Sequence, residues 1–307
     1  MRSNSIKTFF FLVILMALFI FIGGLIGGRS GAIVAFVIAL GANFFSYWFS
    51  GSIVLKMYKA QVVTDDDQPE LVGLVRGLAA KAGMPMPKVA IVPNPTPNAF
   101  ATGRNPANGV VAVTTGIVQL LNKDELEGVI AHELSHIQGR DTLISTLAAS
   151  VAGAVMLLAD FARMSALFGG MSDRNNNNNA LGAVVAILVA ILAPIAAMIV
   201  QMAISRTREY EADASAARIT NKPMALASAL NKITYGNQVM PNTQAKEATA
   251  HMFIINPLAG KKLSNMFSTH PSTEDRIARL KEMALDTGNK SAKVGYTPKS
   301  GGNAMFR

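Results

Sequence analysis

The sequence predicts a mainly α-helical membrane protein, with about four transmembrane helices and a water-exposed domain that contains a small β-sheet. Three observations support this fold class. Half of the 307 residues are hydrophobic and only 15% are charged, whereas about a quarter of the residues in ordinary soluble domains are charged. The apolar residues gather in stretches that are long enough to cross a bilayer. Between these stretches the composition becomes that of a globular domain.

The first two predicted spans form an N-terminal hairpin over residues 1–60. Residues 9–28 and 32–55 are apolar, and the glycine-rich stretch between them has room only for a tight turn. Trp48 lies late in the second span, where interfacial aromatic residues are expected, and Lys56 follows it. Both outer ends of the hairpin carry more basic residues than the turn, so the positive-inside rule predicts that the N-terminus and the chain after residue 60 face the cytoplasm.

Residues 142–204 predict the third and fourth spans. The third span contains Asp160 and Arg163, which have the helical spacing of an ion pair. A run of asparagines over residues 175–179 separates it from the apolar residues 180–204. The sequence leaves open whether both segments cross the bilayer fully.

The water-exposed domain is predicted from two separate stretches, residues 61–141 and 205–285. Pro69 opens an amphipathic helix that Gly83 closes. Residues 286–307 are rich in glycine, lysine and serine, and they predict a flexible tail.

Valine-rich segments predict the small sheet. Residues 88–92 and 109–114 are bounded by proline or glycine, which is typical of strands. Residues 98–103 between them predict an edge strand. Further along the chain, Asn122 and Glu125 have the spacing of a capping box, which predicts the start of a helix.

Composition narrows the possible chemistry. The chain has no cysteine, so disulfides and cysteine-based metal or thiol chemistry are excluded, and histidine and carboxylate remain as metal ligands. The net charge is +9, but the basic residues flank the predicted spans and are spread over the C-terminal region. This distribution fits contact with a lipid bilayer and does not favour nucleic-acid binding.

Two of the four histidines, His132 and His136, lie one helical turn apart in the sequence His-Glu-Leu-Ser-His. They fall on a predicted helix over residues 123–138. Side chains four residues apart share a helix face, so both imidazoles can bind one zinc ion. Glu133 lies at the edge of that face, where its carboxylate can act as a general base toward water. The motif predicts zinc-dependent hydrolysis.

A catalytic zinc site needs a third protein ligand and one open position. Carboxylates at Glu209, Glu211 and Asp213 follow the fourth predicted span. On a helix Glu209 and Asp213 share a face, and Glu211 points away from both. One carboxylate of the pair can bind the metal while the other holds a histidine in place. The alternative is a solvated acidic turn that balances Arg206 and Arg208.

With these motifs the sequence resembles the HtpX family of integral-membrane zinc metalloproteases, which are related to the eukaryotic CAAX-prenyl endoproteases. The resemblance runs from the N-terminal hairpin to about residue 285. It implies a zincin-like metalloprotease domain on the cytoplasmic side, with one Zn²⁺ ion per chain. Together with His132 and His136, the third zinc ligand is implied to be Glu209, the first residue of an E-x-x-x-D signature, with Asp213 as its partner.

The resemblance also implies three residues that handle substrate. His270, which precedes Pro271, resembles a family histidine that helps to stabilise the oxyanion, and Arg276 resembles the arginine that follows it. Asn98 begins a segment that resembles the family's edge strand, which pairs with the substrate backbone. The residues alone also fit a helix start after His270 and an ordinary edge strand at Asn98.

By resemblance, the protein hydrolyses peptide bonds in misfolded or damaged membrane proteins, as part of quality control and stress response in a bacterial cytoplasmic (inner) membrane. One alternative is a narrow-specificity endoprotease for prenylated tails, whose eukaryotic representatives have more than four spans. Another alternative is a metal-binding transporter, for which ionisable residues are expected inside several spans. Physiological substrates, oligomeric state and autocleavage do not follow from the residues.

Overall fold

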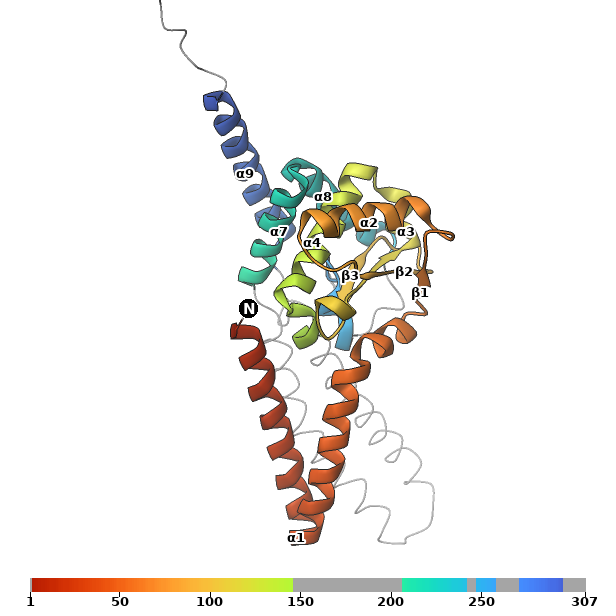
Figure 1. The fold of residues 1–307 in the computed structure, drawn as a ribbon, viewed down its shortest axis with the longest axis vertical. Helices are drawn as coiled ribbons and strands as arrows, with labels where there is room; N and C mark the ends of the chain where they lie inside the picture. The colour runs from red at the N-terminus through yellow and green to blue at the C-terminus, as the bar shows by residue number, and fades with distance from the viewer. Residues whose placement is uncertain (1, 146–205, 242–246, 258–270, 295–307) are drawn as a thin grey trace, which may run out of the picture.

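The computed structural model describes the chain except for residues 1, 146–205, 242–246, 258–270 and 295–307. A long helical element leads into a domain in which helices cover a four-stranded sheet (Figure 1). The described helices are α1 (Arg2–Met57), α2 (Pro69–Lys81), α3 (Thr115–Leu120), α4 (Lys123–Gly139), α7 (Arg206–Thr220), α8 (Pro223–Val239) and α9 (Thr273–Val294). The strands are β1 (Gln61–Val63), β2 (Lys88–Val92), β3 (Ala99–Thr102) and β4 (Val110–Thr114), and short 3-10 turns cover Pro106–Asn108 and Glu247–Met252.

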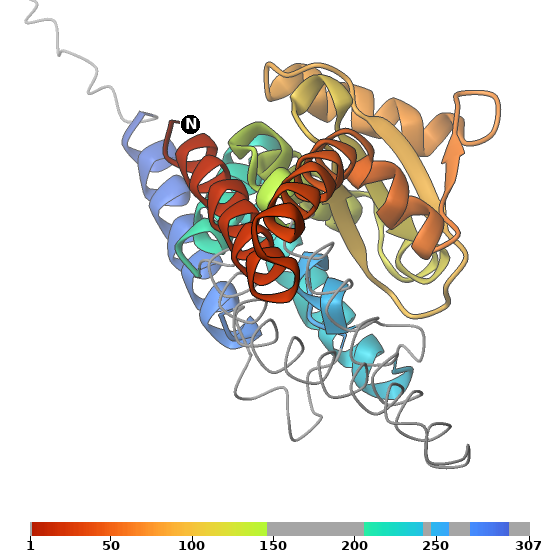
Figure 2. The ribbon, with the colours of Figure 1, turned by 90° about the horizontal axis from the view of Figure 1, so that it is seen from below.

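Element α1 folds back on itself, and its two halves lie side by side in Figure 1 and Figure 2. A Cβ at Gly24 would lie 3.8 Å from the Ala32 Cβ, whereas residues eight apart in a straight helix are separated by about 12 Å. Gly28 supplies the reversal with a φ of +58°, a conformation that costs glycine little. The reversal lies at the turn that the sequence predicts for its hairpin.

Membrane crossing itself stays a prediction. Within the part of the chain that the structure describes, no helix combines the length and the apolar character that a membrane span requires. The predicted third and fourth spans fall almost entirely within residues 146–205, outside the described residues.

The four strands form a mixed sheet in the order β1-β2-β4-β3. β2 and β4 are parallel, and the other two neighbouring pairs are antiparallel. The predicted strands over residues 88–92 and 109–114 are confirmed, and β3 lies at the edge of the sheet as predicted. Strand β1 is not predictable from the sequence, because three residues are too few to show alternation.

Both faces of the sheet are covered. Alternate residues along a strand point to opposite sides, so each central strand contributes side chains to two separate cores. One face packs with α2, α4, α7 and α8 in the main core, and the other packs against the end of α1 and residues 252–253. The helix side includes Val89, Ala99, Ala101, Val111 and Val113, and the opposite side includes Ala90, Val92, Phe100, Val110 and Ala112.

Helix α4 lies at the centre of the domain. Its predicted capping box is present, because the Asn122 side chain accepts from the Glu125 N–H at 3.0 Å and Glu125 accepts from the Asn122 N–H at 2.9 Å. Its apolar face is buried in the core, and the helix packs against α7, α8, β3 and β4. The most deeply buried apolar side chains of α4 are Val129, Ile130, Ala131, Leu134 and Ile137.

The C-terminal boundary differs from the prediction. The sequence places a flexible tail from residue 286, but α9 continues to Val294. Polar and small residues dominate this part of the helix, so the hydrophobic periodicity that marks a helix in sequence is missing there.

Candidate metal centre

Helices α4 and α7 bring three donor side chains together. The His132 and His136 Nε2 atoms lie 3.1 Å apart. Across the helix interface, Glu209 Oε2 lies 3.6 Å from His132 Nε2, and Glu209 Oε1 lies 3.5 Å from His136 Nε2. His132 and Glu209 are buried, and His136 is partly buried.

These separations fit a single zinc ion. In a tetrahedral site with metal–ligand bonds of about 2.0–2.1 Å, ligand atoms lie roughly 3.3 Å apart. The Nε2–Nε2 distance of 3.1 Å is close to this value, and each histidine lies 3.5–3.6 Å from one oxygen of the Glu209 carboxylate. With a single atom taken from each residue, the three donors lie within 4.8 Å of one another. Two imidazole nitrogens and one carboxylate oxygen also form the donor set of many catalytic zinc sites, which leave a fourth position open.

Glu133 lies beside the three donors and is only 2% exposed. Burial raises the pKa of Glu133 above its usual value, and the neighbouring His132 and His136 oppose this rise. A raised pKa makes this carboxylate a stronger proton acceptor, as a general base requires.

The second nitrogen of His132 is held by a buried ion pair. His132 Nδ1 lies 2.9 Å from Asp213 Oδ1, and Arg276 binds both Asp213 oxygens at 2.7 Å. Burial favours neutral side chains, yet Arg276 keeps the pKa of Asp213 down at about 2. Burial alone would also lower the pKa of His132, but hydrogen bonds to Asp213 and Glu209 raise it to about 9.

The second nitrogen of His136 has a similar partner. His136 Nδ1 lies 3.2 Å from Asp141 Oδ2, and Arg208 Nη1 donates to Asp141 Oδ1 at 3.3 Å. Burial opposes ionisation of Asp141, but His136 and Arg208 lower the pKa of this carboxyl below its usual value. Each histidine of the site is therefore backed by a carboxylate that is itself paired with an arginine.

Comparison with known proteins agrees with this geometry. Residues 65–284 match peptidase family M48. The chain belongs to this family. It is 56% identical over 283 residues to a protein named "Protease HtpX homolog" from Pyrococcus abyssi, which covers 92% of this chain and 97% of the relative. A protein of the same name from Desulfatibacillum aliphaticivorans is 50% identical over 300 residues, covering 98% of this chain and 92% of the relative.

A solved structure shares the fold of this M48 peptidase. The crystal structure of S. mikatae Ste24p aligns with a TM-score of 0.50 and 17% identity, over 91% of this chain and 66% of that chain. The M48 chain thus spans a little under two thirds of the length of Ste24p. At this identity the likeness shows the fold alone.

Family membership establishes the reaction class. This M48 chain is a metalloprotease, and its substrates are proteins whose peptide bonds it hydrolyses. The narrow CAAX-type alternative is not favoured, because the relatives with high identity over nearly their full length are HtpX proteases. The family match also favours a protease over a metal transporter.

Most of the predicted site residues of this metalloprotease lie in or beside the candidate metal centre. His132, His136 and Glu209 lie together, Glu133 interacts electrostatically with all three, and Asp213 contacts His132. The side chain of Glu211 is exposed, as expected from its position on the opposite face of α7. The alternative of a solvated acidic turn is wrong for Glu209 and Asp213, because both are buried.

Arg276 and Asn98 lie in contacts within the protein. Arg276 is 1% exposed, and besides Asp213 it donates to the Ile254 carbonyl at 2.9 Å. Asn98 is fully buried, and its side chain donates to the Ile255 carbonyl at 2.9 Å. Contact of either side chain with a substrate stays a prediction.

The outer edge of β3 is covered by the chain itself. The Ile254 N–H donates to the Ala99 carbonyl at 3.0 Å, and Phe100 forms an antiparallel bridge with Phe253. A substrate strand that pairs with Ala99 and Phe100 therefore requires residues 253–254 to move away from β3. His270, the predicted oxyanion ligand, lies outside the described residues.

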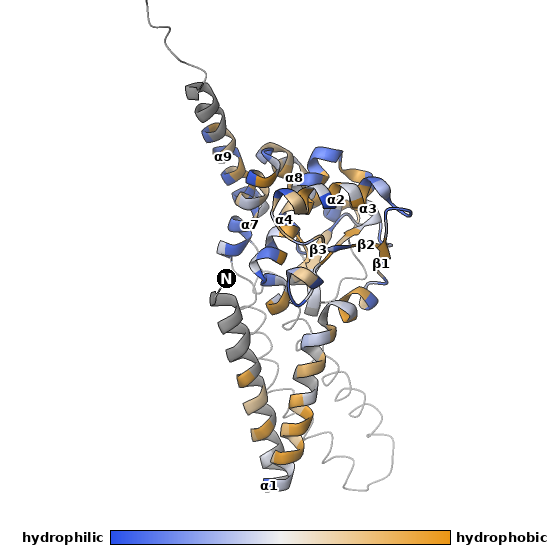
Figure 3. Ribbon diagram, viewed as in Figure 1, coloured by the Kyte–Doolittle hydropathy of each residue, from blue (hydrophilic) through white to orange (hydrophobic). Residues whose placement is uncertain are grey.

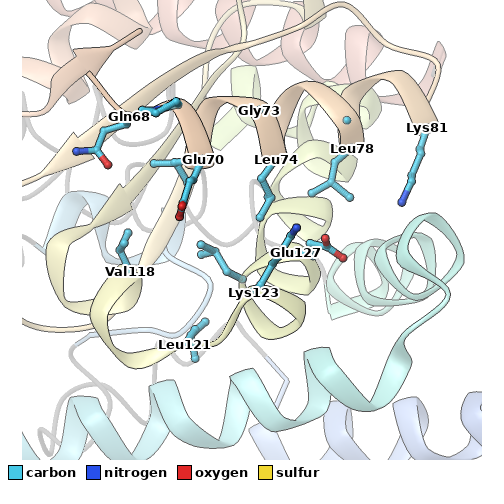
Figure 4. A pocket seen from close by; sticks show the side chains of 14 residues that line it. Gln68, Glu70, Gly73, Leu74, Leu78, Lys81, Val118, Leu121, Lys123 and Glu127 are labelled. Atoms are coloured by element: carbon cyan, nitrogen blue, oxygen red, sulfur yellow. The ribbon is translucent and has the colours of Figure 1, made fainter. Parts of the chain in front are cut away.

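A separate cavity of about 680 Å³ lies between α2, α3 and the start of α4. Figure 4 shows Leu74, Leu78 and Leu121 along its wall, with charged side chains around them. None of the three metal-binding side chains lines it. This cavity is therefore distinct from the metal centre.

The sequence does not predict Asp141 and Arg208 as site residues. In the sequence, Arg208 fits only a role in balancing an acidic turn. The contact between Arg208 and Asp141 joins residues 67 positions apart, so neither helical periodicity nor local spacing could predict it. The one signal in the sequence is that Arg208 directly precedes the predicted ligand Glu209.

Proposed function

We propose that this chain is a membrane-bound, zinc-dependent endopeptidase that removes misfolded or damaged membrane proteins, as part of quality control and stress response. It acts in the cytoplasmic membrane, with its active site on the cytoplasmic side. The convergence of His132, His136 and Glu209 beside the buried Glu133 is the observation that carries the proposal. This donor set is suited to zinc, one ion per chain.

The proposed mechanism divides the work among a few side chains. When bound, zinc supplies a Lewis acid that polarises the peptide carbonyl and acidifies water. Glu133 accepts the proton of the attacking water at its carboxylate and then delivers it to the leaving amine. Asp213, held by Arg276, keeps the His132 ring oriented so that Nε2 faces the other two ligands.

Three further roles in substrate handling belong to the proposal. His270 helps to stabilise the oxyanion, which requires a positioned hydrogen-bond donor. The substrate backbone adds to the edge strand at Asn98, as extended peptides do at other sheet edges. Arg276 also acts in substrate binding, because its bond to the Ile254 carbonyl must be released when residues 253–254 leave this edge to admit the substrate.

The membrane part of the proposal rests on the apolar surface of α1. Val34, Val37 and Ile38 are 57–61% exposed, and Figure 3 shows hydrophobic residues gathered along this element. Soluble proteins rarely expose apolar surfaces of this kind without a partner. We propose that residues 1–60 form a transmembrane hairpin and that residues 142–204 add two further spans. Residues 61–141 and 205–285 then form the protease domain.

Purified protein tests the proposal directly. We expect about one zinc ion per chain and cleavage of casein, and we expect cleavage to stop with a chelator and return when zinc is added. A membrane protein that is destabilised by mutation should be cleaved faster than its stable parent. Cleavage that survives chelation in the absence of bound zinc would contradict the proposed function.

A further inference from the structure

Two arrangements of the same kind support the metal centre, and only one of them follows from the family signature. His132 is backed by Asp213 and Arg276, whereas His136 is backed by Asp141 and Arg208. We propose that Asp141 and Arg208 are positioning residues, which hold His136 and the start of α7 in register for metal binding. The inference deepens the proposed function and rests on zinc as the metal.

The end of α4 explains how Asp141 reaches His136. On a continuous helix a residue five positions further along is rotated by about 140°, so its side chain would point away. Arg140 instead adopts the left-handed conformation with a φ of +59° and ends the helix. Residues 141–145 begin a new helical segment directly after it, and Asp141 Oδ2 comes within 3.2 Å of His136 Nδ1.

The contact with Asp141 determines which nitrogen of the His136 ring carries the hydrogen. A neutral imidazole carries one N–H, and donation from Nδ1 to Asp141 leaves the Nε2 lone pair for the metal. That Nε2 atom faces His132 Nε2 at 3.1 Å and Glu209 Oε1 at 3.5 Å. The negative charge of Asp141 also makes His136 a stronger ligand.

Arg208 links this carboxylate to the third ligand. It directly precedes Glu209 on α7, and neighbouring side chains on a helix point about 100° apart. Glu209 can therefore face the histidines while Arg208 reaches across to Asp141 Oδ1 at 3.3 Å. The ion pair joins the end of α4 to the start of α7, the two helices that carry the ligands.

The burial of this ion pair sets it apart from surface ion pairs. The Asp141 and Arg208 side chains are 14% and 11% exposed, whereas those of Arg76 and Asp65 are 54% and 56% exposed. Exposed pairs contribute little to structure because water screens them. A pair that is largely shielded from water keeps its geometry and can fix the side chains around it.

Zinc affinity of the full-length protein, measured by competition with a chromophoric chelator, tests the proposal. We expect Asp141→Asn to weaken zinc binding by about 10–100-fold, and Arg208→Gln to weaken it less. The double variant should bind zinc no more weakly than Asp141→Asn, because Arg208 acts through Asp141. Asp124→Asn is the control, since Asp124 lies on the same helix in an exposed pair with Lys222, and its affinity should equal that of the wild type.

A second measurement separates positioning from a general loss of stability. The visible absorption of the cobalt-substituted protein reports the ligand geometry, and it should change in Asp141→Asn but not in Asp124→Asn. Wild-type zinc affinity in Asp141→Asn, or an unchanged cobalt spectrum, would overturn the proposal. If Asp141→Asn does not fold, Arg208→Gln carries the same test. Absence of zinc binding in the wild type would instead refute the proposed function.

Discussion

Glu209 and Glu211 are two positions apart, but only Glu209 faces the two histidines. Replacement of Glu209 by alanine should remove the third ligand, and most bound zinc and all proteolysis should be lost with it. Replacement of Glu211 by alanine should leave both unchanged, because this side chain is exposed. Zinc analysis and casein cleavage of the two purified variants check this prediction. The opposite pattern would mean that α7 presents its other face to α4.

Glu133 allows metal binding and proton transfer to be separated. Glu133→Gln keeps the shape of the side chain and removes the proton acceptor, so zinc should remain bound while kcat falls by orders of magnitude. Single-turnover cleavage together with metal analysis is the suitable measurement. A variant that retains substantial kcat would rule out Glu133 as the general base.

The positions of some site residues can be predicted from the sequence, and those of others cannot. His132, His136, Glu209 and Asp213 follow helical periodicity, so their relative orientation can be derived from spacing alone. Spacing does not show that the two histidines on α4 meet the two carboxylates on α7, because no local rule brings distant helices together. Only the family resemblance predicts this contact. Asp141 depends on a left-handed residue at the end of α4, and non-glycine residues adopt this conformation too rarely to be predicted.

Among the helices, the crossing of α4 and α8 depends on a glycine. A Cβ at Gly128 would lie 3.1 Å from the Leu226 Cα, so a larger side chain would push the two helices apart. Gly128→Val should destabilise the protein by about 1–3 kcal/mol through overpacking. Gly73→Val on the exposed side of α2 is the matched control, because nothing lies within 4 Å of a Cβ there. Thermal unfolding should show a lower midpoint only for Gly128→Val.

Local signals explain which elements could be predicted. α2, α4, β2 and β4 have capping residues, proline or glycine at their ends and regular apolar spacing, and the structure contains all four. α3 has six residues, fewer than two helical turns, so its apolar pattern does not repeat. Residues 253–254 cover β3 through a single bridge, a long-range contact that has no local signature.

At the scale of the whole molecule, α1 is attached directly to the protease domain. Tyr58 near its end packs on Phe100 and Phe253 with ring centroids 5.7 and 5.2 Å apart. Arg104 stacks on Trp48 at 4.5 Å. The edge strand of the sheet therefore contacts the element that we propose lies in the membrane.

The shared metal centre also restricts the topology of the whole chain. α4 ends before residues 146–205 and α7 begins after them, yet both carry candidate ligands of one site. If this site binds one metal ion, as we propose, the two helices lie on the same side of the membrane, which requires an even number of crossings between them or none. The two spans predicted for residues 142–204 satisfy this condition, and a single span does not.

Single cysteines introduced into this cysteine-free chain can test the predicted topology with a membrane-impermeant thiol reagent. Cysteine at Ser30 should be labelled in sealed cells, whereas cysteine at Thr64 should be labelled only after permeabilisation, because positive charge keeps that side in the cytoplasm. Cysteine at Thr287 should behave like cysteine at Thr64, since α9 packs on α7 and α8.

Cysteine at Asn177 tests whether the chain between α4 and α7 crosses the membrane twice or not at all. External labelling there requires two spans, and protection indicates none. External labelling at Thr64 would reverse the orientation, and opposite behaviour of Thr64 and Thr287 would be incompatible with ligands from α4 and α7 in one metal centre.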